Sequence, residues 1–118
     1  MGLMSFLMGR SLPEVTCEEL AGGLGGAQAP LVLDVRSPEE FAAGHVPGAM
    51  NIPHDQLSRR HAELATHRGR PVVVCCRSGM RAGMAAKVLH HEGFTDVRML
   101  SGHMQAWCAA GRPLTKGA

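Results

Sequence analysis

The chain has 118 residues, the size of one ordinary domain, and 45% of them are hydrophobic, which is ample for a packed core. A formal net charge of +2 is too small to indicate nucleic acid as a partner. No run of 18 apolar residues is present, so no membrane span is predicted. We interpret residues 1–11 as a short apolar N-terminal extension and residues 12–115 as one domain.

Apolar runs and helix-start signals alternate along the chain in the order typical of an α/β domain. In chain order we predict a strand over 12–15, a helix from 16, a strand over 31–35, a helix from 37, a strand over 49–52, a helix over 54–67, a strand ending at 75, a helix from 82 to about 92, a strand over 97–100 and a helix over 103–110. This order favours a small, mainly parallel five-stranded sheet with helices on both faces.

Two of the predicted helices begin with a specific local signal. Thr16 and Glu19 have the spacing of a capping box, in which each side chain accepts a hydrogen bond from the backbone of the other residue. Ser37 and Glu40 repeat this spacing, and Pro38 suits the first helical position. We therefore expect Glu40 to be a capping residue rather than a catalytic acid.

The most informative stretch of the chain is residues 71–82. Three consecutive valines predict a strand buried on both faces, and this apolar run ends at Cys75 and Cys76. In a parallel sheet, ligands bind beyond the carboxyl end of a strand, where loop amides and the positive end of the next helix favour an anion. We therefore expect a cysteine held there as its thiolate, with help from Arg77 and Arg81.

The four cysteines are Cys17, Cys75, Cys76 and Cys108. They form no CxxC pair and the histidines lack metal-ligand spacing, so neither a metal site nor a cofactor is predicted. Adjacent cysteines do not readily form a disulfide, and the apolar start does not open with the basic residues of a signal peptide, so a cytoplasmic location is expected. Since strand side chains alternate, Cys75 should point into the core, and Cys17 and Cys108 should be small buried residues.

Three segments in collinear order resemble the rhodanese family, the single-domain sulfurtransferases. They are residues 34–53, with Asp-Val-Arg-Ser-Pro-Glu-Glu-Phe, Gly-His-Val-Pro-Gly-Ala and Asn-Ile-Pro; residues 76–81, Cys-Arg-Ser-Gly-Met-Arg; and residues 100–111, with Leu-Ser-Gly-His, Ala-Trp and Gly. The match covers roughly residues 12–114. It implies a small parallel sheet flanked by helices, in agreement with the order of elements.

The resemblance also implies roles for individual residues. Cys76 takes the position of the sulfur-carrying nucleophile. The loop that binds the anionic substrate corresponds to Arg77, Ser78, Gly79, Met80 and Arg81. Asp34 and Arg36 fall at a neighbouring strand end, where the implied role is support of this loop.

The implied activity is transfer of sulfur through a persulfide on Cys76. A small anionic donor such as thiosulfate would load the cysteine, and cyanide, a thiol or a sulfur-acceptor protein would take the sulfur. The reaction would be covalent catalysis with ping-pong kinetics.

Other functions use a similar loop. Tyrosine-type phosphatases and arsenate reductases hold a thiolate with five residues between Cys and Arg, which is the spacing from Cys75 to Arg81. Their glycine lies three residues after the nucleophile, which fits only Cys76, and the four residues from there to Arg81 suggest a tighter cup suited to one sulfur atom. A regulatory binding module or a persulfide carrier that docks through residues 3–8 is the other alternative, and the presence of the loop cysteine favours activity.

Overall fold

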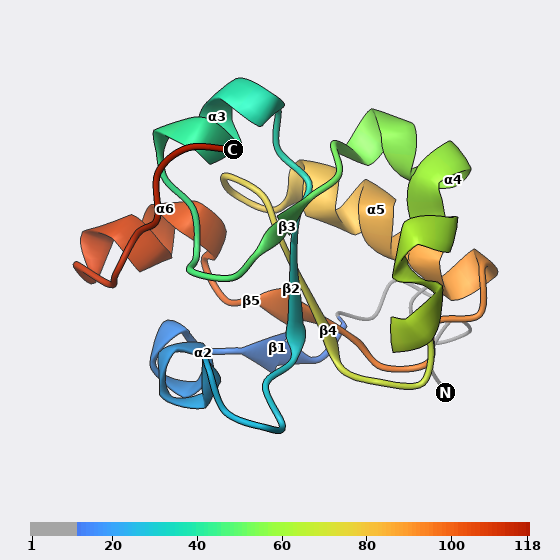
Figure 1. Cartoon of the computed structure of the whole chain (residues 1–118), viewed down its shortest axis with the longest axis horizontal. Coiled ribbons are helices and arrows are strands. Elements are labelled where there is room, and N and C mark those ends of the chain that lie inside the picture. The colour runs from blue at the N-terminus through green and yellow to red at the C-terminus, as the bar shows by residue number, and fades with distance from the viewer. Residues whose placement is uncertain (1–11) are drawn as a thin grey trace.

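The computed structural model describes residues 12–118, and the N-terminal extension predicted over residues 1–11 lies outside the described residues. A five-stranded sheet forms the centre of the fold (Figure 1). Its strands are β1 (Glu14–Val15), β2 (Leu31–Asp34), β3 (Met50–Asn51), β4 (Val72–Cys75) and β5 (Val97–Leu100), in the order β1-β5-β4-β2-β3. Each neighbouring pair is parallel, so the predicted α/β class is confirmed.

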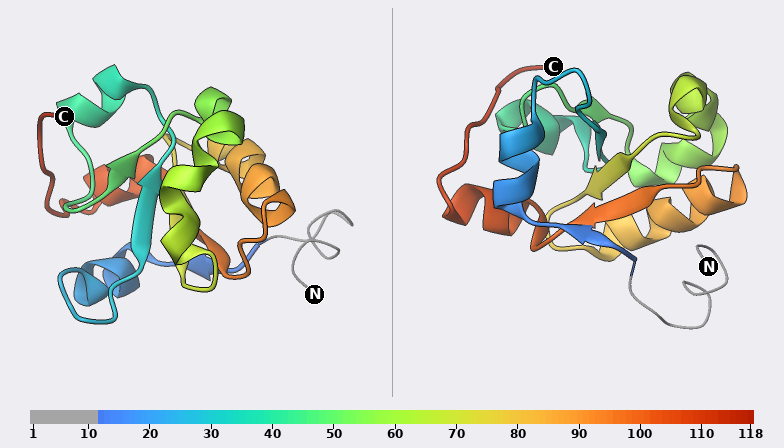
Figure 2. Two further views of the ribbon diagram at one scale, coloured as in Figure 1. Left: turned by 45° about the vertical axis from the view of Figure 1, so that its right-hand side comes forward. Right: turned by 90° about the horizontal axis from the view of Figure 1, so that it is seen from below.

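Helices cover both faces of this sheet (Figure 2). They are α2 (Cys17–Gly23), α3 (Pro38–Ala43), α4 (Leu57–Arg60), α5 (Met80–His91) and α6 (His103–Ala109), with 3₁₀ turns η1 (His54–Gln56) and η2 (His61–His67) on either side of α4. α4 and α5 pack on one face, and α2 and α6 pack on the other. None of the described helices has the length and hydrophobicity needed to cross a bilayer.

The valines of β4 alternate between two hydrophobic cores, as expected for a strand buried on both faces. Val72 and Val74 lie in the core beneath α4 and α5, whereas Val73 lies in the core beneath α2 and α6. Trp107 anchors the second core: it is fully buried, and its indole N–H donates a hydrogen bond to the carbonyl of Pro113 at 2.8 Å.

Both predicted capping boxes are present. The Thr16 hydroxyl accepts a hydrogen bond from the Glu19 N–H at 3.0 Å, and the Glu19 carboxylate accepts one from the Thr16 N–H at 2.9 Å. Ser37 and Glu40 make the same reciprocal pair at 3.2 and 3.1 Å. The caps start α2 directly after β1 and α3 soon after β2, so both helices begin at the carboxyl edge of the sheet.

The helix boundaries differ from the predictions in two places. Residues 54–67, predicted as one helix, form α4 between the two 3₁₀ segments, and Leu57 and Leu64 are buried, on the face that the prediction assigned to the core. The helix predicted to begin at 82 begins at Met80, so Met80 and Arg81 form its first turn rather than the end of the loop.

Two cysteines are less buried than predicted. Cys108 is exposed, because it follows Trp107 on α6 and is turned away from the sheet that this tryptophan faces. Cys17, the first residue of α2, is partly buried. All four cysteines of the chain are free thiols.

Candidate active site

The candidate active site lies at the carboxyl end of β4, the middle strand of the sheet. β4 ends at Cys75, residues 76–79 form a tight loop, and α5 begins at Met80. In Figure 1 this loop extends beyond the sheet between α5 and the ends of α3 and α6. The site therefore occupies the crevice that parallel α/β sheets use for ligands.

Cys75 and Cys76 belong to opposite faces of the sheet. Cys75 is fully buried in the core beneath α6, and this burial raises the pKa of its thiol well above the ordinary value, with a smaller contribution from the nearby Asp34 carboxylate. The prediction that Cys75 points into the core is confirmed. Cys76 is on the other side and only 1% exposed, and its Sγ accepts a hydrogen bond from the Gly79 N–H at 3.0 Å. This amide is placed to stabilise negative charge on the Cys76 sulfur.

Gly79 has a backbone conformation that other residues rarely adopt. Its φ is +127°, and a Cβ at this position would lie 3.1 Å from Nε2 of His103. The loop can therefore turn its amide toward Cys76 because residue 79 has no side chain.

The two arginines after Cys76 have different surroundings. Arg81 donates two hydrogen bonds to the carboxylate of Glu40, at 2.6 and 3.0 Å. The bonds from Arg81, followed by those from Ser37, lower the pKa of Glu40 to about 2 despite partial burial. Arg77 is exposed and lines a cavity of about 370 Å³ beside α3 and α6, together with Cys108 on α6. Glu40 is thus both the predicted capping residue and an unpredicted partner of Arg81.

Asp34 and Arg36 form a buried ion pair next to the strand that carries the site. Arg36 donates to both carboxylate oxygens of Asp34, with the shortest distance 2.7 Å, and to the carbonyl of Gly44 at 2.8 Å. Asp34 is aligned with Cys75 across the β2–β4 pair. The pair therefore holds the chain at the end of β2 rather than facing the thiol of Cys76.

His103 lies in the Leu-Ser-Gly-His motif of residues 100–111, but its contact with the loop after β4 is not predicted from the sequence. The residue is 7% exposed, and its Nδ1 accepts a hydrogen bond from the Cys76 N–H at 3.2 Å. The amides of Met104 and Gln105 donate to the carbonyls of Cys76 and Arg77, at 3.0 and 3.1 Å. The first turn of α6 is thus bonded to the start of the loop over residues 76–79.

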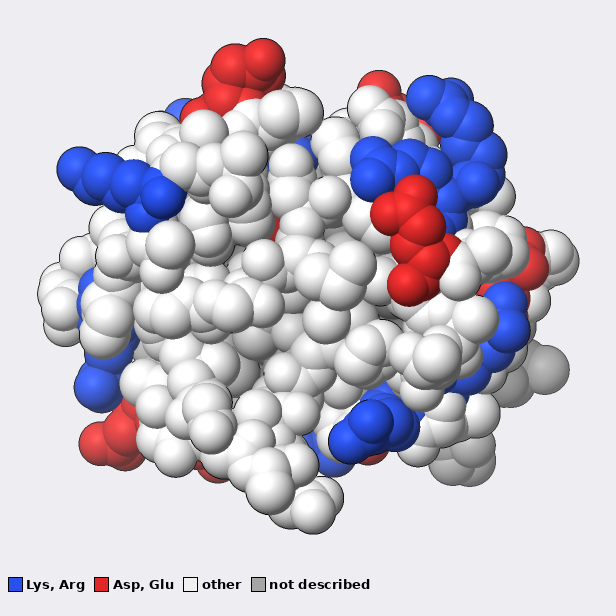
Figure 3. Space-filling model, in the orientation of Figure 1, with Lys and Arg blue, Asp and Glu red and all other residues white. Residues whose placement is uncertain are grey.

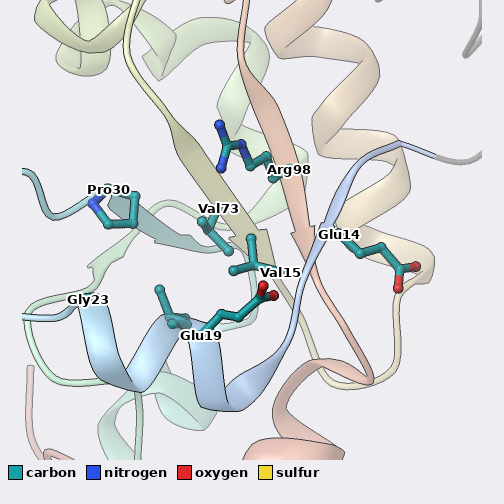
Figure 4. Close-up of a pocket in the computed structure, with 8 residues that line it drawn as sticks. Glu14, Val15, Glu19, Gly23, Pro30, Val73 and Arg98 are labelled. Atoms are coloured by element: carbon teal, nitrogen blue, oxygen red, sulfur yellow. The ribbon is translucent and has the colours of Figure 1, made fainter.

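One further cavity lies away from this loop. A second cavity, of about 280 Å³, is lined by Val15, Glu19, Val73 and Arg98 among others and by no residue of the loop (Figure 4). On the face shown in Figure 3, lysine and arginine side chains are dispersed and several adjoin acidic ones. Within residues 12–118, no three histidine, cysteine or acidic side chains are grouped as metal ligands would be.

Known proteins are similar to this chain in sequence and in fold. The sequence model of the rhodanese-like domain matches residues 16–110. A protein named sulfurtransferase from Allochromatium vinosum is 34% identical over 101 residues, which cover 86% of this chain and 92% of that protein. Thiosulfate sulfurtransferase 16, chloroplastic, from Arabidopsis thaliana is 37% identical over 91 residues, which cover 69% of this chain and 76% of that protein.

A solved structure agrees with these relatives. The crystal structure of a rhodanese-related protein from Thermoplasma volcanium has a TM-score of 0.75 and 28% sequence identity, and the match covers 87% of this chain and 97% of that chain. The resemblance predicted from the three sequence motifs is confirmed. The chain belongs to the family of rhodanese-like domains.

Proposed function

We propose that the protein transfers sulfane sulfur from a small anionic donor, with thiosulfate the best candidate, to cyanide, a thiol or a sulfur-acceptor protein through a persulfide on Cys76. The observation that carries this proposal is the hydrogen bond from the Gly79 amide to the Cys76 sulfur at the carboxyl end of the middle strand. The family membership of the chain supports the same reaction class. We assign the activity to residues 12–115.

The reaction takes place in two steps. The thiolate of Cys76 attacks the outer sulfur of thiosulfate, the bond between the two thiosulfate sulfurs breaks, and sulfite leaves with the electron pair. A nucleophilic acceptor then attacks the outer sulfur of the persulfide and restores the Cys76 thiolate. The Gly79 amide favours the anionic sulfur in both steps, since it is already oriented and needs no reorganisation.

The donor is proposed to enter beside Arg77. This guanidinium is exposed and lines the larger cavity, so it can bind the sulfonate end of thiosulfate by charge-assisted hydrogen bonds. Backbone groups of Ser78 and Gly79 surround the incoming sulfur, and Met80, which is 82% exposed, forms the rim. Arg81 contributes positive charge while its hydrogen bonds to Glu40 hold the first turn of α5.

A phosphatase or arsenate reductase is less compatible with this geometry. Such an enzyme needs the loop arginine to bind a tetrahedral oxyanion. In this structure both terminal nitrogens of Arg81 already donate hydrogen bonds to the carboxylate of Glu40. A non-catalytic module does not explain an amide directed at a free thiol. The four free thiols are consistent with a reducing compartment such as the cytoplasm.

The test is mass spectrometry of the intact protein and its peptides after incubation with thiosulfate. We expect a gain of one sulfur on Cys76, its removal by cyanide, and no gain in Cys76→Ser. Cys75→Ser is the matched control and should still be loaded. Sulfur on Cys75 instead, or hydrolysis of an aryl phosphate without turnover of thiosulfate, would refute the proposal.

A further inference from the structure

His103 is held in an unfavourable backbone conformation. Its φ is +52°, and it is the one residue other than glycine with a positive φ among residues 12–118. An L-residue in this left-handed region is strained and persists only where its surroundings hold it there. Gly102 before it has the same handedness, with φ +71°, and a Cβ there would come 2.4 Å from the Cβ of Ala106. The turn therefore aims the imidazole in a direction that an ordinary helix start would not provide.

The imidazole lies between the two residues that create the thiol environment. Its Nδ1 accepts the hydrogen bond of the Cys76 amide, and its Nε2 edge packs against Gly79, which donates to the Cys76 sulfur. The carbonyl of Cys76 is bound by the next residue of α6, Met104. Both sides of the Cys76 backbone are thus held by consecutive residues of α6, and the angle at which Cys76 presents its sulfur depends on them.

The hydrogen bond also defines the protonation state of His103. Because the Cys76 amide donates to Nδ1, this nitrogen carries no proton, so the ring is neutral and protonated on Nε2. Burial lowers the pKa of His103, and the Glu14 carboxylate on β1 opposes that shift. Glu14 is the titratable group whose charge acts on the ring, and the adjoining residues of α6, Met104 and Gln105, are uncharged.

We propose that His103 is a positioning residue for sulfur transfer: the neutral imidazole fixes the Cys76 peptide so that the thiol meets the Gly79 amide, and protonation of the imidazole releases it. An imidazolium would place an N–H donor against the N–H of Cys76, which breaks the hydrogen bond. This inference rests on the proposed function of Cys76. It adds a residue from outside the loop and a dependence of the site on the charge of that residue.

Two substitutions separate the hydrogen bond from the backbone conformation. Asparagine tolerates a positive φ, and its side-chain oxygen can accept a hydrogen bond much as Nδ1 does, but it does not titrate. Glycine adopts the same φ and offers no acceptor. We expect His103→Asn to keep kcat/KM for thiosulfate near the wild-type value at pH 8, and His103→Gly to lower it about tenfold, the effect of one lost hydrogen bond.

The pH dependence of kcat/KM distinguishes a positioning role of His103 from a purely structural one. The ratio of kcat/KM between wild type and His103→Asn should be constant above pH 7 and fall toward pH 5, because only the wild type loses its acceptor. Ionisation of Cys76 or of the donor affects both proteins and cancels in this ratio. A ratio that stays constant through the pH range in which NMR detects protonation of the His103 ring, or equal activity of the Asn and Gly variants, would overturn the proposal.

A second measurement does not require turnover. Nitrogen-15 NMR of the imidazole should show the Nε2–H tautomer at pH 8, and the Cys76 amide resonance should shift in His103→Gly but little in His103→Asn. The opposite tautomer, or a Cys76 amide insensitive to both substitutions, would refute the positioning role even if sulfur transfer is confirmed. Conversely, the expected NMR result with no sulfur loading would leave the hydrogen bond in place and reject the function of Cys76.

Discussion

The ion pair between Glu40 and Arg81 should stabilise the fold in a pH-dependent manner. It joins the first turn of α3 to the first turn of α5, next to the loop over residues 76–79. We choose Glu40→Gln as the perturbation, because glutamine at this position can still complete the capping box with Ser37. The substitution therefore removes the charge of residue 40 and its pairing with Arg81 while it leaves the start of α3 capped.

The size of the effect can be bounded from the pKa of Glu40. Lowering it from 4.5 to about 2 corresponds to an upper limit of about 3 kcal/mol in the free energy of unfolding. The two side chains are 33% and 29% exposed, so solvent screening reduces this value. We expect Glu40→Gln to lower the free energy of unfolding by about 1–2 kcal/mol at pH 7.

The pH dependence has a definite sign. A carboxyl group whose folded pKa is depressed stabilises the fold above its unfolded pKa, so the full contribution is present at pH 7. As pH falls from 4.5 toward 2, the wild type takes up the proton on Glu40 and loses the contribution. The difference in unfolding free energy between wild type and Glu40→Gln should therefore shrink over this range and be clearly smaller at pH 3 than at pH 7.

Urea unfolding followed by the fluorescence of the single tryptophan measures this difference. Glu39→Gln is the matched control, because Glu39 is an exposed acidic residue in the same first turn of α3. The Glu39→Gln substitution should lower the free energy of unfolding by less than about 0.5 kcal/mol at pH 7. Equal losses in the two variants, or a loss in Glu40→Gln that is the same at pH 3 and pH 7, would show that the pair with Arg81 does not stabilise the fold.

Three further predictions concern the loop and its supports. Gly79→Ala should lower the free energy of unfolding in urea by about 1–3 kcal/mol and slow persulfide formation, because alanine at positive φ is strained and its Cβ would press on the His103 ring. Unchanged stability would contradict the strained conformation. Asp34→Asn leaves the guanidinium of Arg36 buried without its charge partner, so we expect the free energy of unfolding to fall by about 3–5 kcal/mol. A decrease below about 1 kcal/mol in the same assay would show that the pair is dispensable. Iodoacetamide should label Cys108 in the native protein but leave Cys75 unlabelled until urea is added, because burial raises the pKa of the Cys75 thiol and blocks access. Peptide mass mapping measures the labelling, and labelled Cys75 in the native protein would contradict this expectation.

Local signals in the sequence were sufficient for much of the fold. The capping boxes at Thr16 and Ser37 depend on residues only three positions apart, so they can be recognised without knowledge of the tertiary structure. The valines before Cys75 specify a doubly buried strand, and strand alternation then separates the directions of Cys75 and Cys76. The position of the candidate site follows from these features and from the parallel order of the strands.

The remaining features depend on contacts between distant parts of the chain. The carboxylate of Glu40 reaches Arg81 across 41 positions, and the imidazole of His103 reaches the Cys76 amide across 27. His103 lies in a recognisable motif, but nothing in a single sequence pairs it with Cys76, or Glu40 with Arg81. The exposure of Cys108 was also mispredicted, because the face of α6 that meets the sheet is set by where Trp107 packs, and composition does not give this orientation.

The strand order has a consequence for how the protein is made. β1, at the start of the sheet, pairs with β5, and the turn of α6 that supports Cys76 follows β5 in the chain. Parallel pairings of this kind join distant segments, and such topologies fold slowly. While a ribosome is still translating, the Cys76 backbone therefore lacks its hydrogen-bond partners in α6, and the core that buries the Cys76 sulfur is incomplete. We expect a nascent or partly denatured chain to be more readily damaged by peroxide at this cysteine than the finished protein.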